Sequence, residues 1–172
     1  ENVNSENVIE EYIWVSAAEF LDSLGVDIIN TSLGYISFDE EQMTHDYVDF
    51  DGETCVITIG SEIASSKGIL CVAAAGNEGD ALFPYIGAPG DGKSVLTVGG
   101  VKADGVKTSF SSIGPTYDGR IKPDVMSFAY AVSLASPGGG YYEGNGTSFA
   151  APSMSGMLAC FWQAKPMASE SE

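Results

Sequence analysis

Residues 69–77 read Ile-Leu-Cys-Val-Ala-Ala-Ala-Gly-Asn, an apolar run that ends in a glycine and an amide side chain. A run that is this short and apolar at every position is typical of a strand buried on both faces of a parallel sheet. A helical pattern over 57–67 precedes it and stops at Gly68. This helix-strand unit is the first indication of an α/β fold.

The same order of elements occurs upstream. Apolar residues recur at helical spacing between Asn7 and Leu24, with Asn7 and Glu10 as the predicted cap and Gly25 as the stop. Residues 26–33 then form another short apolar run. Two such units in succession predict a parallel sheet within one piece of α/β domain that spans 1–172. Downstream we expect a strand over 95–101, little regular structure over 108–123, and a helix over 148–162.

The charge of the chain excludes some classes of partner. The sequence holds 24 acidic and 7 basic residues, a formal net charge of −17. Nucleic acids and anionic membrane surfaces are bound through clustered Lys and Arg, so neither is an expected partner. The acidic residues are spread along the chain, which favours a solvated surface.

One acidic segment invites comparison with a calcium loop. Residues 49–53 contain three carboxylates and Gly52, but Tyr47 and Thr58 stand where liganding carboxylates are required. A turn at Asp51-Gly52 is therefore the favoured interpretation.

The three cysteines give no disulfide or metal pattern, because their number is odd and no Cys-x-x-Cys spacing occurs. Cys71 lies in an apolar run and Cys160 in an apolar helix, and two of the three are predicted to be core thiols. Neither a signal peptide nor a membrane-spanning stretch of about 18 apolar residues is recognised.

Three unusual segments fall where ligands collect in such folds, at the carboxyl ends of strands and at helix starts. They are Ser-Leu-Gly at 32–34, Ala-Ala-Gly-Asn at 74–77, and Gly-Asn-Gly-Thr-Ser at 144–148. A serine that opens a helix after glycines exposes its hydroxyl, and its own N–H is free to stabilise an oxyanion. Ser148 is thus a candidate nucleophile, although Ser148 or Thr147 could also serve only as a helix cap.

Longer strings identify a family. Gly-Thr-Ser-Phe-Ala-Ala-Pro at 146–152, Ala-Gly-Asn-Glu-Gly at 75–79 and Ile-Asn-Thr-Ser-Leu-Gly at 29–34 resemble the subtilisin-like serine peptidases, or subtilases, in matching order. Supporting strings lie at 110–115 and 118–124. The resemblance implies a three-layer subtilisin-like α/β fold with a mostly parallel sheet, represented here by its C-terminal portion.

The same resemblance assigns site residues. It makes Ser148 the nucleophile and Asn77 the side-chain donor of the oxyanion hole. The substrate backbone would pair with the strand end formed by Ser32, Leu33 and Gly34. The small residues Ala74, Ala75, Gly76 and Gly87 would wall a pocket for a large apolar side chain, beside a cis bond between Ala88 and Pro89.

Two parts of the family pattern are missing. A triad needs a His base and an Asp that orients it, and the family carries them in Asp-Thr/Ser-Gly and His-Gly-Thr motifs. Asp22 lies in a superficially similar string that closes a helix, and His45, the single histidine, is predicted to be a surface or loop-structural residue. We therefore expect the Asp and His upstream of this sequence, and expect the chain alone to be nearly inert.

The resemblance also gives expectations for partners. Polypeptide substrates and the upstream portion of the same domain are expected, together with self-association through the 26–33 strand. No cofactor is required for the chemistry, a structural calcium stays open for the full-length protein, and a secreted or cell-surface location is expected. A catalytically dead protein that binds extended peptides is the alternative. An unrelated α/β-hydrolase is disfavoured because Ser148 lacks a Gly-x-Ser-x-Gly elbow.

Overall fold

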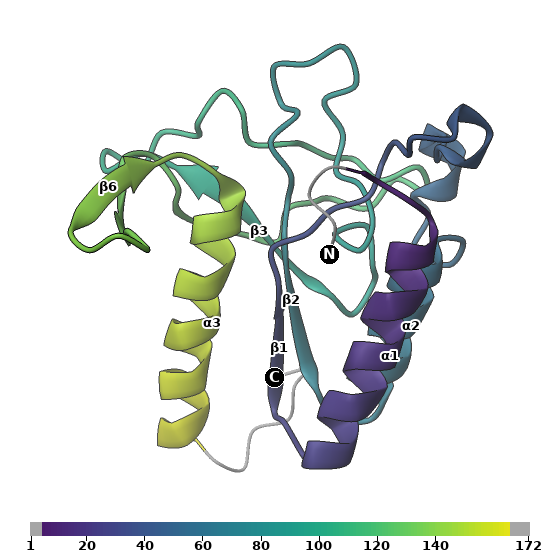
Figure 1. Cartoon of the computed structure of the whole chain (residues 1–172), viewed down its shortest axis with the longest axis horizontal. Coiled ribbons are helices and arrows are strands. Elements are labelled where there is room, and N and C mark those ends of the chain that lie inside the picture. The colour runs from purple at the N-terminus through teal and green to yellow at the C-terminus, as the bar shows by residue number, and fades with distance from the viewer. Residues whose placement is uncertain (1–4, 166–172) are drawn as a thin grey trace.

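The computed structural model describes residues 5–165 and has three layers, a parallel sheet between helices (Figure 1). The main elements are α1 Ile9–Leu24, β1 Ile28–Thr31, α2 Val56–Ser66, β2 Leu70–Ala74, β3 Leu96–Val101, β4 Val125–Phe128, β5 Val132–Ala135, β6 Tyr141–Gly144 and α3 Thr147–Ala164. Short 3-10 turns span Glu41–Met43 and Tyr47–Asp49. The predicted α/β class and parallel sheet are confirmed.

The four strands of the main sheet lie in the order β1-β2-β3-β4, and every pair is parallel. Ile28 is paired with Leu70, and Val72 with Leu96. All carboxyl ends therefore point to the same edge of the sheet, where β1 continues into Ser32 and β2 into Asn77. This edge is where the sequence predicted that ligands collect.

Alternation along β2 divides the core between the two faces of the sheet. Cys71 and Ala73 pack toward α1 and α2, in a cluster that includes Ala18. Val72 and Ala74 face α3. Because both faces are covered, β2 is apolar at every position, as its sequence indicated.

The helix boundaries differ slightly from the prediction. Helix α1 begins at Ile9 with Val8 as its N-cap, and no side chain caps it. The Asn7 cap was therefore wrong, although Glu10 accepts a hydrogen bond from the Asn7 N–H at 3.3 Å. Gly25 ends the helix in the left-handed conformation, as predicted.

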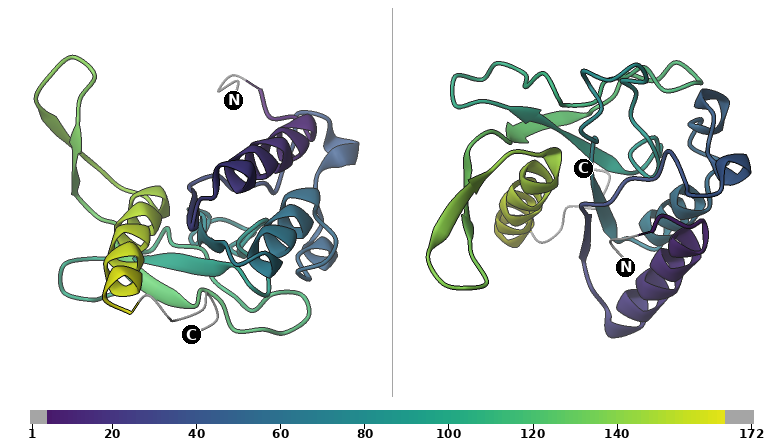
Figure 2. Two further views of the ribbon diagram at one scale, coloured as in Figure 1. Left: turned by 90° about the horizontal axis from the view of Figure 1, so that it is seen from below. Right: turned by 45° about the horizontal axis from the view of Figure 1, so that its top comes forward.

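Three strands were not predicted. β4 joins the main sheet beside β3, and β5 pairs with β6 as an antiparallel hairpin that extends away from the body (Figure 2). Their segments are short and partly exposed, so they lack the continuous apolar run that marks β2.

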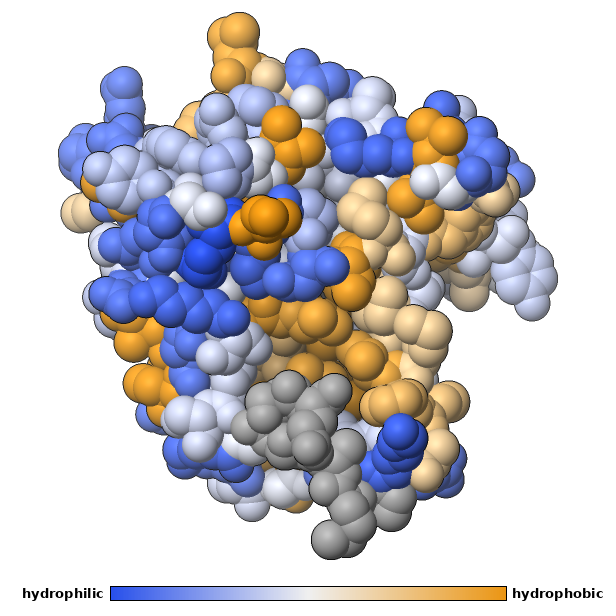
Figure 3. All heavy atoms as spheres, turned by 180° about the vertical axis from the view of Figure 1, so that it is seen from behind, coloured by the Kyte–Doolittle hydropathy of each residue, from blue (hydrophilic) through white to orange (hydrophobic). Residues whose placement is uncertain are grey.

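The sheet has two free edges among the described residues, because β1 pairs only with β2 and β4 only with β3. Within residues 5–165 the 26–33 segment therefore has a strand on one side only, and β1 itself is only Ile28–Thr31. At the other edge β4 exposes Met126 and Phe128. Apolar side chains also gather near the middle of the face seen from behind (Figure 3).

Candidate active site

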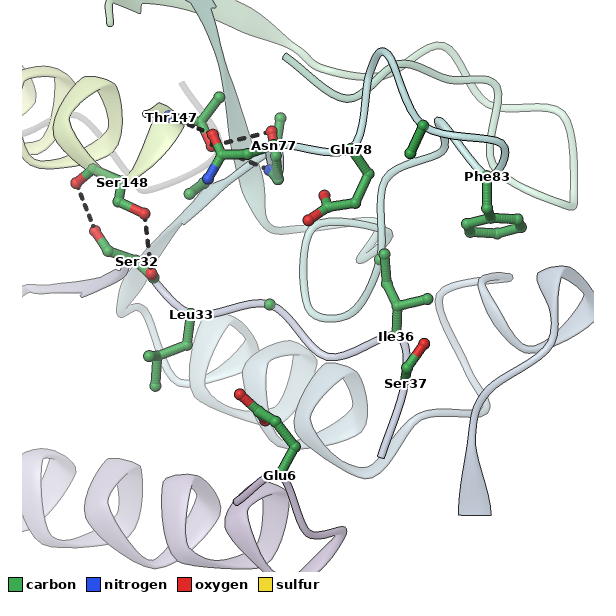
Figure 4. Close-up of a pocket in the computed structure, with 16 residues that line it drawn as sticks. Glu6, Ser32, Leu33, Ile36, Ser37, Asn77, Glu78, Phe83, Thr147 and Ser148 are labelled. Atoms are coloured by element: carbon green, nitrogen blue, oxygen red, sulfur yellow. Dashed lines mark hydrogen bonds between the residues drawn. The ribbon is translucent and has the colours of Figure 1, made fainter. Parts of the chain in front are cut away.

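Ser148 lies in the first turn of α3, next to the segment that follows β1 (Figure 4). Its hydroxyl donates a hydrogen bond to the carbonyl oxygen of Ser32 at 3.3 Å, and the Ser32 hydroxyl donates to the carbonyl oxygen of Ser148 at 2.9 Å. The two serines therefore hold each other reciprocally across 116 positions of the chain. In the first turn of a helix, the Ser148 N–H has no intrahelical acceptor.

Asn77 has a fixed amide orientation. Its Oδ1 accepts hydrogen bonds from the N–H of Thr147 at 2.9 Å and from the Thr147 hydroxyl at 3.1 Å. The amide nitrogen is thereby left to meet a ligand, and in Figure 4 it lies on the side of Ser148. An amide held in this way is a preorganised dipole for developing negative charge.

Thr147 was missed as a site residue. It is fully buried, and its Oγ1 lies 3.1 Å from both the N and the O of Gly76, in addition to its contact with Asn77. It thus joins α3 to the end of β2. The sequence signal was its place beside Ser148, where it was considered only as a cap.

One pocket of about 400 Å³ brings all the predicted site residues together. They are Ser148, Asn77, Ser32, Leu33, Gly34, Ala74, Ala75, Gly76 and Gly87. The segment after β1 forms one wall and the end of β2 forms another. Gly87 is brought close by Ala88, which exchanges backbone hydrogen bonds with Tyr35.

At two positions of this pocket, neighbouring atoms lie too close to the backbone for any residue larger than glycine. A Cβ on Gly87 would lie 2.9 Å from the carbonyl oxygen of Tyr35 and 2.5 Å from Ile36. Gly76 adopts φ +100°, and a Cβ there would lie 2.5 Å from Glu78 Oε2. The predicted cis bond between Ala88 and Pro89 is present.

The pocket carries charge in addition to the small residues that were expected to wall it for a large apolar side chain. Glu6 and Glu78 both line it, and in Figure 4 the Glu78 carboxylate points into it. Glu78 Oε2 accepts a hydrogen bond from the Ser112 hydroxyl at 2.9 Å, while Ser112 Oγ accepts one from the Glu78 N–H. The acid was visible in the 75–79 string, but its direction depends on the left-handed turn at Gly76.

His45 lies in a loop and forms an ion pair, as a loop-structural residue would, but it is not a surface residue. Its Nε2 lies 2.6 Å from Oε1 of Glu11, and the two side chains are 15% and 0% exposed. The hydrogen bond to Glu11 raises the pKa of His45, while burial opposes it. Glu11 Oε2 also accepts the N–H of Ile57, so this pair joins α1, the loop and α2.

The acidic segment 49–53 forms the expected turn. Gly52 has φ +81°, and Asp51 Oδ1 accepts hydrogen bonds from the N–H groups of Glu53 and Thr54. Within residues 5–165, no group of three or more His, Cys, Asp or Glu side chains is arranged to hold a metal ion. Asp22 pairs with Lys67 at the end of α1.

The cysteine prediction was half right. Cys71 is buried, and burial raises the pKa of its thiol. Cys160 is exposed, whereas Cys55 is the second buried thiol. Helix α3 is apolar on its exposed side too, with Met157 and Phe161 in solvent, so its hydrophobicity did not indicate burial.

Comparison with known proteins identifies the family. The family model described as the subtilase family matches residues 1–172. The chain belongs to the subtilase family. Subtilisin NAT of Bacillus subtilis subsp. natto is 32% identical over 158 residues, covering 91% of this chain and 36% of that protein. Subtilisin DY of Bacillus licheniformis is 33% identical and is matched over 50% of its length, with 92% of this chain covered.

Solved subtilase structures share the fold. The self-cleaved protease domain of PatA aligns with a TM-score of 0.70 and 28% identity, covering 87% of this chain and 50% of that one. Sphericase aligns with a TM-score of 0.66 and 26% identity, covering 94% and 51%. The chain thus spans about a third to a half of the length of these four proteins. Among the helices of residues 5–165, none combines the length and apolarity needed to cross a bilayer.

Proposed function

We propose that this subtilase chain is the nucleophile-bearing part of a serine endopeptidase. The observation that carries the proposal is the Asn77 amide held by Thr147 beside the Ser148 hydroxyl, in one pocket with the segment after β1. A nucleophile, an oxyanion donor and a place for an extended peptide are three separate requirements of acyl transfer.

The reaction follows from these positions. Ser148 Oγ attacks the scissile carbonyl carbon while a histidine takes its proton. The oxyanion accepts hydrogen bonds from the Asn77 amide nitrogen and the Ser148 N–H. The histidine then protonates the leaving amine, which gives an acyl-enzyme. Water attacks this ester while the histidine takes its proton, and the histidine then returns a proton to Ser148 Oγ as the acid product leaves.

The histidine and its aspartate are proposed to come from another part of the same domain. His45 is held by Glu11 and lies outside the described lining of the pocket. Two observations support an additional part: β1 has a free edge in the described sheet, and the relatives are about two to three times longer than the matched region. Loss of the histidine from a subtilisin triad is already known to cost on the order of 10⁶ in turnover, so the chain alone is expected to be nearly inert.

Substrates are proposed to be polypeptides that pair with Ser32–Gly34 and place a large apolar or aromatic side chain between Ala74–Gly76 and Gly87. Small residues leave volume there. Glu78 adds a carboxylate, which would attract a basic substrate side chain and makes such a side chain the second expected specificity. A secreted or cell-surface location is proposed on the family resemblance.

A fluorophosphonate probe tests the assignment. The protein that includes the Asp and His should be labelled on Ser148, and Ser148→Ala should abolish labelling. Ser153→Ala is the matched control, because Ser153 lies on the same helix and its hydroxyl donates to the carbonyl oxygen of Phe149. Absence of labelling in the complete protein would instead support a binding protein that does not cleave.

A further inference from the structure

Helix α3 contains a proline that frees one carbonyl group next to the reaction centre. Pro152 lies inside the helix, four residues after Ser148. In an α-helix the N–H of a residue bonds to the carbonyl four positions earlier, and proline has no N–H. The Ser148 carbonyl is thus deprived of its helical partner.

The segment after β1 supplies a substitute donor. The Ser32 hydroxyl lies 2.9 Å from the Ser148 carbonyl oxygen and donates to it. A single hydroxyl can rotate toward several acceptors, so a second group is needed to hold its direction. Asn30 provides this, because its Nδ2 donates to Ser32 Oγ at 3.2 Å.

The orientation of Asn30 is set in turn by α3. Ser155 donates from its hydroxyl to Asn30 Oδ1 at 3.0 Å, and it also lies 3.1 Å from the Ala151 carbonyl oxygen. Ser148 and Ser155 are seven residues apart and so share a face of the helix, while Asn30 lies in β1 and Ser32 directly follows that strand. The donors therefore run in one direction, Ser155 to Asn30 to Ser32 to Ser148.

We propose that Asn30 and Ser32 are positioning residues, which compensate for Pro152 by anchoring the Ser148 carbonyl to the peptide-binding segment. This inference rests on the proposed peptidase function. Under this proposal, the segment around Asn30 and Ser32 positions both the nucleophile and the substrate backbone. A misplacement of about 1 Å at such a centre can cost about 10² in rate.

The substitution Asn30→Asp tests the direction of the donors at almost constant shape. A carboxylate still accepts from Ser155 but cannot donate to Ser32, and it draws the Ser32 hydroxyl away from Ser148. In the complete protein, with active sites counted by titration, we expect kcat to fall about tenfold with KM unchanged within about twofold. Ser155→Ala should lower kcat about threefold, and the control Ser153→Ala should leave it unchanged.

The deciding experiment measures the effect of Asn30→Asp in a protein that also carries Pro152→Ala. The alanine restores the helical N–H, so the Ser148 carbonyl no longer depends on Ser32. We expect Asn30→Asp to lose its effect on kcat in that background. An effect of charge or of general destabilisation would persist there, and a persistent effect would overturn the proposal, as would an unchanged kcat in Asn30→Asp alone.

A second readout separates this inference from the proposed function. If the complete wild-type protein is not labelled by fluorophosphonate, the peptidase proposal fails. Hydrogen exchange of the amides over 147–151 in the same complete protein then decides the present one. Exchange several-fold faster in Asn30→Asp than in wild type, and not in Ser153→Ala, would sustain it. Equal exchange in all three would refute it.

Discussion

Asn77 has one side of its amide committed to Thr147, which fixes where its nitrogen can donate. Asn77→Ala should therefore lower turnover without changing the pocket walls. The expected loss is about 10² to 10³ in kcat, the range already known for loss of the equivalent kind of donor from a subtilisin. Steady-state kinetics on the complete protein would show it, and a change confined to KM would contradict the assignment.

Thr147 gives a graded version of the same experiment. Thr147→Val keeps the shape and the N–H bond to Asn77 Oδ1 but removes the hydroxyl contacts to Gly76 and Asn77. A buried neutral hydrogen bond contributes about 1 kcal/mol, so a fall in kcat of about five- to tenfold is expected. A loss equal to that of Asn77→Ala would mean that Thr147 acts by more than orienting the amide.

Glu78 should influence which side chain is cleaved. Its carboxylate lines the pocket, and the charge attracts a basic side chain while it disfavours an acidic one. Glu78→Gln is expected to lower kcat/KM for a Lys substrate about tenfold relative to a Leu substrate. A peptide library with paired Lys and Leu positions measures the ratio, and an unchanged ratio would remove Glu78 from the specificity pocket.

The roles of single residues were only partly readable from the sequence. Ser148 and Asn77 could be assigned because each lies in a string that resembles the family's, and both line the same pocket. Thr147 and Asn30 could not, because their hydrogen bonds cross 70 and 125 positions of the chain to partners that the local pattern does not reveal. The direction of Glu78 likewise depends on backbone geometry at Gly76.

At the scale of elements, His45 links a loop to two helices. The fold raises its pKa through the hydrogen bond with Glu11, with further contributions from Asp49 and Asp91. A raised pKa stabilises the fold fully below the unfolded value of about 6.5, and this stabilisation is lost as pH rises through the folded value. Urea unfolding should accordingly show a decline in stability above neutral pH.

Replacement of this histidine checks the origin of that decline. His45→Gln should be less stable than wild type near pH 6, and its free energy of unfolding should vary less with pH across the window just above neutrality. If the variant and the wild type lose stability in parallel as the pH rises, another group is responsible.

How well each helix or strand was predicted depended on the strength of its sequence pattern. β2 and α2 were predicted within one or two residues because glycines flank β2 on both sides, Gly68 follows α2, and β2 is an apolar buried run. β4 and the β5–β6 hairpin were missed because strands of only four residues, alternately exposed in β4 and β5 and mostly exposed in β6, carry almost no periodic signal. β1 is shorter than predicted because residues 32–34 leave the ladder to line the pocket.

For the whole molecule, the free edge of β1 predicts self-association of the isolated chain. Its outer backbone groups form a template for another strand, whereas a net charge of −17 opposes the approach of a second copy. Salt screens this repulsion, since the Debye length falls from about 14 Å at 0.05 M to about 4 Å at 0.5 M ionic strength.

Light scattering at the two salt concentrations would test this. We expect a larger mass at high salt, and expect that the complete protein stays monomeric in both. A monodisperse monomer at both concentrations, with cooperative unfolding, would show that β1 needs no neighbour.

The order of strands across the sheet, β1 to β4, is also their order along the chain. Each strand can thus pair with its predecessor as synthesis proceeds from the N-terminus. Helix α3, which packs on all four strands, leaves the ribosome after them. Ser148, the proposed nucleophile, therefore reaches Asn77 and Ser32 last, so a nascent chain that stalls before α3 would hold the proposed peptide groove without the residue proposed to cut what enters it.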